Sequence, residues 1–227
     1  MGKLSFLLAE DYIKPKIYFK SKQSPTVNVN ALYSSTDHEI FSGLENLTQL
    51  LCSPKGFIVS AFQIDFYQTL PRLIAQSIKR SHSFKKLYIL GPELSLSILK
   101  RSTTTIYESH FKDYEYINVE QDSELVTDQC VNLLKEGHIL YVLPETSVCW
   151  RPQSNVQTEK VTHALCSTFL SQQVNVPILA TASVNDTNHV KIFPADCPKS
   201  YTGDLEIRVN EQSETIYNLL ESSKLEH

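Results

Sequence analysis

The chain has 227 residues, of which 41% are hydrophobic, and this is enough apolar material for the core of one large domain. Its net charge of −4 and pI of about 6.0 provide no overall basic field, so we do not expect nucleic acid as its main partner. No apolar run approaches the roughly 20 residues that cross a bilayer, and we expect no transmembrane segment.

The two ends of the chain are predicted to lie outside the folded domain. Residues 1–35 mix lysines, aromatic residues and prolines without periodicity, and we interpret them as an N-terminal arm. Residues 225–227 look like a cloning scar that leads into a trimmed tag. The folded domain is therefore predicted to span residues 36–224.

The cysteines are widely spaced, odd in number and form no C-x-x-C motif. This usage favours reduced, partly buried thiols in a cytoplasmic protein over a disulfide framework, and it predicts no metal site. The five residues are Cys52, Cys130, Cys149, Cys166 and Cys197.

Helix and strand patterns alternate along the chain from residue 38. Apolar spacing predicts a helix over 38–53, a buried strand over 57–61, a helix over 64–80, a strand over 85–91, a helix over 93–101 and a strand over 114–119. A helix over 122–137 and a strand over 138–144 follow. The remaining expectations are a helix over 158–173, a hairpin of strands 176–184 and 189–195, a strand over 204–209 and a helix over 211–223.

This alternation predicts an α/β fold with a central mixed, mostly parallel sheet and helices on both faces. The dinucleotide-binding, P-loop and serine-hydrolase motifs (G-x-G-x-x-G, G-x-x-x-x-G-K-[ST] and G-x-S-x-G) are absent from the sequence. We therefore predict no nucleotide cofactor and no serine nucleophile of the hydrolase type.

Polar side chains follow two of the predicted strands, at the point where each strand ends. In open α/β sheets, ligands bind beyond the carboxyl ends of the strands, so both exits are candidate site segments. The candidates are Gln63, Asp65 and Tyr67 after the strand at 57–61, and Glu145, Trp150 and Arg151 after the strand at 138–144.

The order of segments resembles the lipid A biosynthesis acyltransferase family of the glycerolipid acyltransferase fold. "GLENLTQLLCSPKGFIVSAFQIDFYQTLPRLIA" is similar to its opening block, in which a helix, a glycine and a strand precede a histidine-x4-acid motif. "LLKEGHILYVLPETSVCW" is similar to its second block, and "TEKVTHALCSTFLSQQVNVPILATASV" is similar to the helix and strand that follow. The similarity covers about residues 40–220.

The histidine-x4-acid motif of that family is not kept. Alignment of the first block puts Phe62 and Tyr67 at the two motif positions, and a slip of one residue puts Gln63 and Gln68 there. Phenylalanine cannot accept a proton, and glutamine is not a base at neutral pH. A literal H-x4-E occurs at residues 110–115, before the third strand, and we interpret it as a coincidence.

The resemblance assigns roles to the candidate residues. Gln63, Asp65 and Glu145 are the candidate catalytic residues, since Glu145 falls where the family has an acid after a proline. Tyr67, Trp150 and Arg151 are candidate substrate-binding residues. Simpler roles remain open: Asp65 is a good helix cap, and Glu145 with Arg151 fits an ordinary loop ion pair.

The function implied by the resemblance is transfer of an acyl group from a thioester, carried on coenzyme A or a carrier protein, to an amine or hydroxyl acceptor. An amine acceptor needs less base assistance, which makes the loss of the histidine tolerable. Two alternatives stay open. One is a catalytically inactive homologue that serves as a binding or partner subunit, and the other is the same fold used for hydrolysis or cyclisation of a carrier-bound intermediate.

Overall fold

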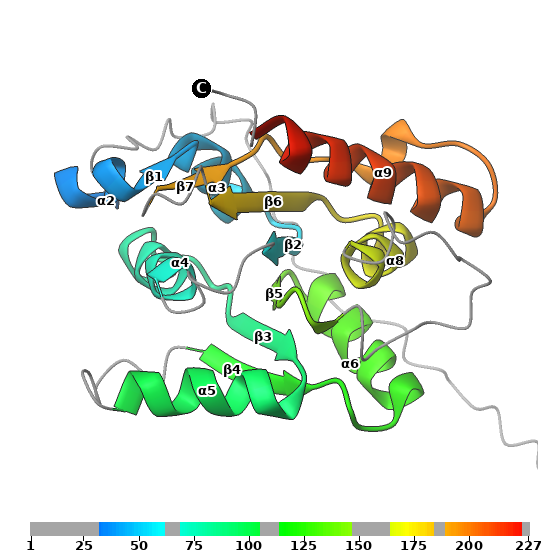
Figure 1. Ribbon diagram of the computed structural model, residues 1–227, viewed down its shortest axis with the longest axis horizontal. Helices are drawn as coiled ribbons and strands as arrows, with labels where there is room; N and C mark the ends of the chain where they lie inside the picture. Colours follow the sequence, from blue (N-terminus) through cyan, green and yellow to red (C-terminus); the bar gives the residue numbers. More distant parts are fainter. Residues whose placement is uncertain (1–31, 62–68, 105–113, 147–163, 184–188, 224–227) are drawn as a thin grey trace, which may run out of the picture.

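The computed structural model describes residues 32–61, 69–104, 114–146, 164–183 and 189–223, which form an α/β fold around one seven-stranded sheet (Figure 1). The strand order is β1-β7-β6-β2-β5-β3-β4. Strands β6, β2, β5, β3 and β4 are parallel, whereas β7 is antiparallel to β6 and β1 is parallel to β7. The strands are β1 (Phe41–Ser42), β2 (Phe57–Ala61), β3 (Leu87–Gly91), β4 (Tyr114–Asn118), β5 (Ile139–Val142), β6 (Ile178–Ser183) and β7 (Val190–Ile192).

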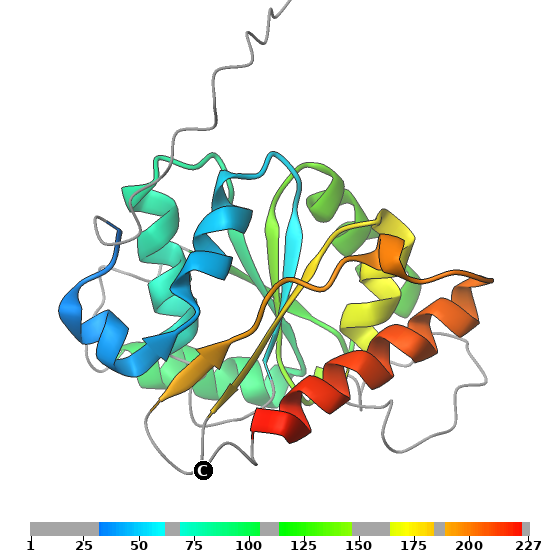
Figure 2. The same cartoon turned by 90° about the horizontal axis from the view of Figure 1, so that it is seen from above.

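Helices cover both faces of the sheet, as Figure 2 shows from above. One face carries α2 (Ser35–Ile40), α3 (Leu44–Cys52), α4 (Thr69–Arg80) and α5 (Glu93–Thr104). The other carries α6 (Ser123–Lys135), α8 (Leu165–Val174) and α9 (Leu205–Ser223), which is preceded by the short 3-10 helix η3 (Pro198–Ser200). Within the ranges given above, none of the helices is both long and apolar enough to span a bilayer.

The core consists of two apolar layers that meet at β2. All five residues of β2 are buried, because β5 and β6 flank the strand and helices cover its two faces. Phe57 and Val59 point to the layer under α3 and α4, whereas Ile58 points to the layer under α6 and α8. This is the strand pattern expected in a parallel sheet that is buried on both sides.

The predicted α/β class and mixed, mostly parallel sheet are confirmed, and most predicted elements occur within a few residues of their expected limits. The expected hairpin is confirmed as the antiparallel pair β6 and β7, with Thr181 opposite Ile192. Leu32 and Tyr33, at the end of the predicted arm, are buried in the core. Residues 1–31 lie outside the described part of the chain, so the arm stays a prediction there.

The prediction of one helix over residues 38–53 is wrong. The chain instead forms α2, then the short strand β1, then α3. Phe41 and Ser42 pair with Val190 and Lys191 of β7, and Gly43 has a φ of 77°, which glycine adopts without strain. The helical spacing of apolar residues in α3 extends back through Phe41. The sequence pattern therefore gave no sign of the break between α2 and α3.

The predicted strand over residues 204–209 is also wrong, because these residues form the start of α9. Asp204 caps the helix, since its carboxylate accepts a hydrogen bond from the Ile207 backbone N–H at 3.0 Å. Ile207 is exposed, whereas Val209 is buried. The alternating apolar residues therefore do not face one side, and the buried face of this helix also carries the polar residues Gln212 and Ser213.

Those buried polar groups form a network between α8 and α9. Gln212 of α9 accepts from the side chain of Gln172 at 2.8 Å and donates to the Asp196 carboxylate at 2.6 Å. The other Asp196 oxygen accepts from the Tyr201 hydroxyl at 2.8 Å, and burial raises the pKa of Tyr201 to about 12. Thr168 and Ser213 share a further hydrogen bond of 2.7 Å. The network joins α9 to α8 beside the apolar contacts of Val209, Ile216 and Leu220.

We expect Gln212→Leu to lower the free energy of unfolding by about 2–4 kcal/mol, because it leaves the amide of Gln172 and the carboxylate of Asp196 without this buried partner. Gln173→Leu, at an exposed position of α8, is the matched control and should change stability by less than about 0.5 kcal/mol. Urea unfolding measures both variants. If Gln212→Leu and Gln173→Leu had equal free energies of unfolding, the network would not contribute to holding α9.

Candidate functional site at the carboxyl ends of the strands

The two predicted site segments begin at one edge of the sheet. Strands β2 and β5 are parallel neighbours, paired from Phe57 with Ile139 to Ser60 with Val142, so their carboxyl ends lie side by side. Of the six predicted site residues, Glu145 lies within the described part of the chain. The other five, Gln63, Asp65, Tyr67, Trp150 and Arg151, lie outside the described residues, and their roles stay predictions.

A tight turn after β5 places Glu145. The Leu143 backbone N–H donates to the Leu90 carbonyl oxygen of β3 at 3.0 Å, and the Thr146 N–H donates to the Leu143 carbonyl at 3.0 Å. The Thr146 hydroxyl, which is fully buried, also donates to the Leu90 carbonyl at 2.9 Å. A Cβ at Gly91 would overlap the Leu143 side chain, so the glycine allows this close approach. The turn is therefore fixed to the end of β3.

Glu145 itself is half-buried, and its Oε2 atom is shielded from solvent. A carboxylate accepts hydrogen bonds only, so at this edge it suits a ligand that presents a hydroxyl or an ammonium group. Because the turn is held by three hydrogen bonds, the carboxylate is presented from a fixed backbone, which is what positioning of a reactant requires.

Beneath the edge, buried hydroxyl groups tie the end of β2 to its neighbours. The Ser167 hydroxyl of α8 donates to the Ser60 hydroxyl at 3.0 Å, and the Thr181 hydroxyl of β6 lies 3.4 Å from the Ser60 carbonyl oxygen. All three residues are buried. Their hydroxyls bond to protein atoms, and we interpret them as supports of the edge rather than nucleophiles.

A second polar cluster lies at the amino ends of the strands. The Lys85 ammonium donates to the carbonyl oxygens of Gly137 at 2.8 Å and Lys55 at 2.5 Å, and burial lowers the pKa of Lys85 to about 8. The His138 Nδ1 atom accepts from the Lys86 backbone N–H at 3.3 Å, and burial is the main cause that lowers the pKa of His138. These contacts join three loops, so we assign the cluster to structure rather than to chemistry.

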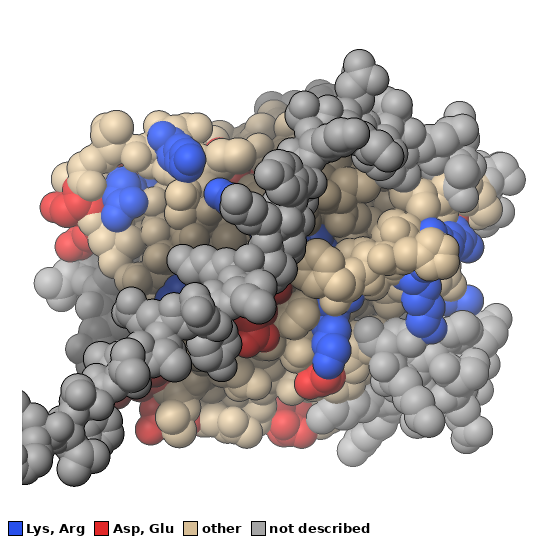
Figure 3. Space-filling model, turned by 180° about the vertical axis from the view of Figure 1, so that it is seen from behind, with Lys and Arg blue, Asp and Glu red and all other residues tan. Residues whose placement is uncertain are grey.

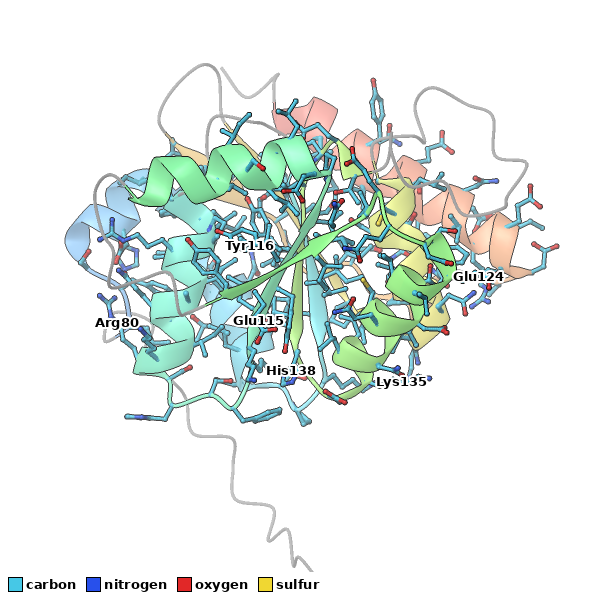
Figure 4. The ribbon with its side chains drawn as sticks, turned by 90° about the horizontal axis from the view of Figure 1, so that it is seen from below. Arg80, Glu115, Tyr116, Glu124, Lys135 and His138 are labelled. Carbon is cyan, nitrogen blue, oxygen red and sulfur yellow. The ribbon has the colours of Figure 1, made fainter. Side chains whose placement is uncertain are left out.

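His138 packs against Tyr88, with the two ring centroids 5.7 Å apart. Figure 4 shows it beside Glu115, which lies within β4 and is exposed. Glu115 is the acid of the literal H-x4-E, and His110 lies outside the described residues. The position of Glu115 within a strand, rather than beyond its carboxyl end, gives no support to a catalytic pair there.

The described thiols divide into two kinds. Cys52 and Cys197 are exposed, whereas Cys130 of α6 and Cys166 of α8 are buried. Burial raises the pKa of Cys130 to about 12 and that of Cys166 well above its ordinary value, so neither is a thiolate nucleophile at neutral pH. Across the described ranges, no group of three or more His, Cys, Asp and Glu side chains is arranged to hold a metal ion.

Comparison with known proteins adds no relative, since neither a family model nor a curated protein matches the sequence. The resemblance to the acyltransferase family therefore stays a prediction.

The sequence pattern missed Thr146 and Ser60 as supports of the edge. A buried hydroxyl within an apolar strand is the signal that could have indicated Ser60, because such a group needs a partner. Nothing local distinguishes Thr146, whose partner, the Leu90 carbonyl, is 56 positions away in sequence.

We expect Thr146→Val to lower the free energy of unfolding by about 1 kcal/mol, because the substitution keeps the shape and removes one buried hydrogen bond. The matched control is Thr127→Val on the solvent side of α6, where the hydroxyl bonds within its own helix. The control should stay within about 0.5 kcal/mol of the wild type. If Thr146→Val had the same free energy of unfolding in urea as the wild type, the proposed role of the Thr146 hydroxyl in holding the turn would be contradicted.

The buried thiol predicts a pH effect on stability. Cys130 keeps its proton in the folded state up to about pH 12, whereas the unfolded thiol loses it near its ordinary pKa of 9.0. Its contribution is therefore complete below pH 9 and is lost as the pH rises toward 12; at pH 10 the loss is about 1.4 kcal/mol. Cys130→Ala should make the fall in stability between pH 8 and 10 shallower than in the wild type. Urea unfolding at several pH values gives both slopes, and equal slopes would contradict the assignment.

Proposed function

We propose that the chain is an acyltransferase-like enzyme that moves an acyl group from a thioester, on coenzyme A or a carrier protein, to an amine or hydroxyl acceptor. The observation that supports the proposal is the pairing of β2 with β5. Because these strands are parallel neighbours, residues 62–68 and the turn bearing Glu145 both follow strands that end at the same edge of the sheet. The segments that resemble the family's two site blocks are the ones that begin there.

When the acceptor is a neutral amine, the reaction needs little assistance from a general base. The nitrogen lone pair attacks the thioester carbonyl, a C–N bond forms, the C–S bond breaks, and the thiolate leaves with the proton that the nitrogen releases. Glu145 would hold the acceptor through a hydrogen bond, with Asp65 as its partner in this role. Gln63 would donate its amide N–H to the developing oxyanion.

Purified protein incubated with an acyl-coenzyme A and a primary amine tests the proposal directly. We expect release of free thiol together with acylated amine, measured by a thiol reagent and by mass spectrometry. The triple variant Gln63→Ala, Asp65→Asn, Glu145→Gln should lower the rate by about a hundredfold or more, since it removes positioning and oxyanion groups together.

Glu214→Gln, at an exposed position of α9, removes one negative charge away from the edge and serves as the control; its rate should equal that of the wild type. A wild-type rate no higher than that of the triple variant would contradict the enzymatic proposal. Binding of an acyl chain without turnover in the same assay would instead favour the non-catalytic homologue.

A further inference from the structure

His138 joins three elements at the amino ends of the strands. Its backbone N–H donates to the Leu133 carbonyl oxygen of α6 at 3.0 Å, and its carbonyl oxygen accepts from the Phe57 N–H of β2 at 3.3 Å. Its ring accepts from the backbone N–H of Lys86, the residue before β3, at 3.3 Å. We call these three contacts the amino-end junction, because through them one residue links α6, β2 and β3 just before β5 begins.

The backbone around the junction is held on several sides. Gly137 and His138 complete a Schellman motif at the end of α6, in which Gly137 has a φ of 91°. The Gly137 carbonyl oxygen accepts from the buried Lys85 ammonium at 2.8 Å, and the Ile139 N–H donates to the Lys86 carbonyl oxygen at 2.9 Å. A change in the His138 ring therefore acts on a backbone that cannot move aside without breaking further bonds.

The contact with Lys86 fixes where the proton of the His138 ring lies. A backbone N–H only donates, so the Nδ1 atom that accepts from it carries no hydrogen, and the ring is neutral with its proton on Nε2. If the ring takes up a second proton from solvent, Nδ1 becomes a donor and two N–H groups face each other. The imidazolium and the Lys86 hydrogen bond therefore exclude one another.

Groups of both signs surround the ring. Burial is the main cause that lowers the pKa of His138 below its ordinary value of 6.5, and the Lys86 and Lys85 ammonium groups act in the same direction. The Glu136 Oε2 atom, 3.6 Å from Nε2, and Glu115 of β4, beside the ring in Figure 4, act in the opposite direction, as does the carbonyl end of α6. The net result favours the neutral ring.

Tyr88 of β3, which packs against the ring, carries no charge at neutral or acidic pH, because burial raises the pKa of its hydroxyl. On the face behind the view of Figure 1, described Lys, Arg, Asp and Glu side chains are interspersed, so that face presents no broad field of one sign (Figure 3). The charge of the His138 ring is therefore decided by its burial and by the groups next to it.

We propose that His138 is a pH-sensitive switch that opens the amino-end junction when its ring takes up a proton. The neutral ring holds the junction closed, whereas the imidazolium releases the Lys86 N–H and loosens the start of β3. The stabilising effect is complete well above pH 6.5, where the ring is neutral in the folded and the unfolded chain, and it is lost as the pH falls toward the lower pKa of the folded state. The proposal does not depend on acyl transfer, which would take place at the opposite edge of the sheet.

NMR spectroscopy of the full chain tests the switch. We expect the His138 ring resonances to titrate below pH 6.5. The Lys86 amide, after correction for its intrinsic exchange rate, should lose about threefold or more of its protection from hydrogen exchange between pH 7 and pH 5. Glu136→Gln removes a charge that favours the imidazolium, so it should move both changes to lower pH.

His138→Asn keeps an acceptor oxygen near the Nδ1 position and removes the titrating group, so the Lys86 amide should keep its protection within about twofold over the same range. His82→Asn is the matched control, since His82 is exposed and its φ of 50° suits asparagine. Because this change leaves the Lys86 hydrogen bond in place, the Lys86 amide should respond to pH as in the wild type.

Three results would overturn the proposal. They are a wild-type His138 ring that titrates at or above pH 6.5, a Lys86 amide that is equally protected at pH 5 and pH 7, and a His138→Asn protein that loses this protection as the wild type does. The first two are measured on the wild type, so they decide the question even if a variant does not fold.

Discussion

The constraint on which the structure depends is the position of β2 between β5 and β6. Every residue of β2 is buried, and its backbone pairs in parallel on both sides. A parallel strand in this position needs helices on both faces, so the two apolar layers and their helices follow from it. It also fixes which strands end together, because the carboxyl ends of parallel neighbours meet at one edge.

That edge carries buried polar groups that fix its geometry. Buried hydrogen bonds hold the turn after β5 onto β3. The Ser167 hydroxyl ties the Ser60 hydroxyl of β2 to α8, and the Thr181 hydroxyl ties the Ser60 carbonyl oxygen to β6.

The sequence pattern succeeded where apolar periodicity was strong and local. The helix that follows Asp122 was predicted, and the buried strands β2, β3 and β5 were found because short apolar runs between turn signals have few other interpretations. It failed at residues 38–53, where a continuous apolar spacing crosses a break at Gly43, and at residues 204–209, where alternating apolar residues begin a helix that buries Val209 and leaves Ile207 exposed. In both places the segment has a distant partner, which is β7 for Phe41 and Gln172 of α8 for Arg208.

The sequence by itself determined the α/β class, the order of most elements and the polar character of the strand exits, because these depend on residues close together in the chain. Only the tertiary structure decided that the exits of β2 and β5 are neighbours, that Thr146 holds the turn bearing Glu145, and that Gln212 bridges Gln172 and Asp196. The reason is that strand order and long-range hydrogen bonds join residues dozens of positions apart, and local spacing does not encode which of them meet.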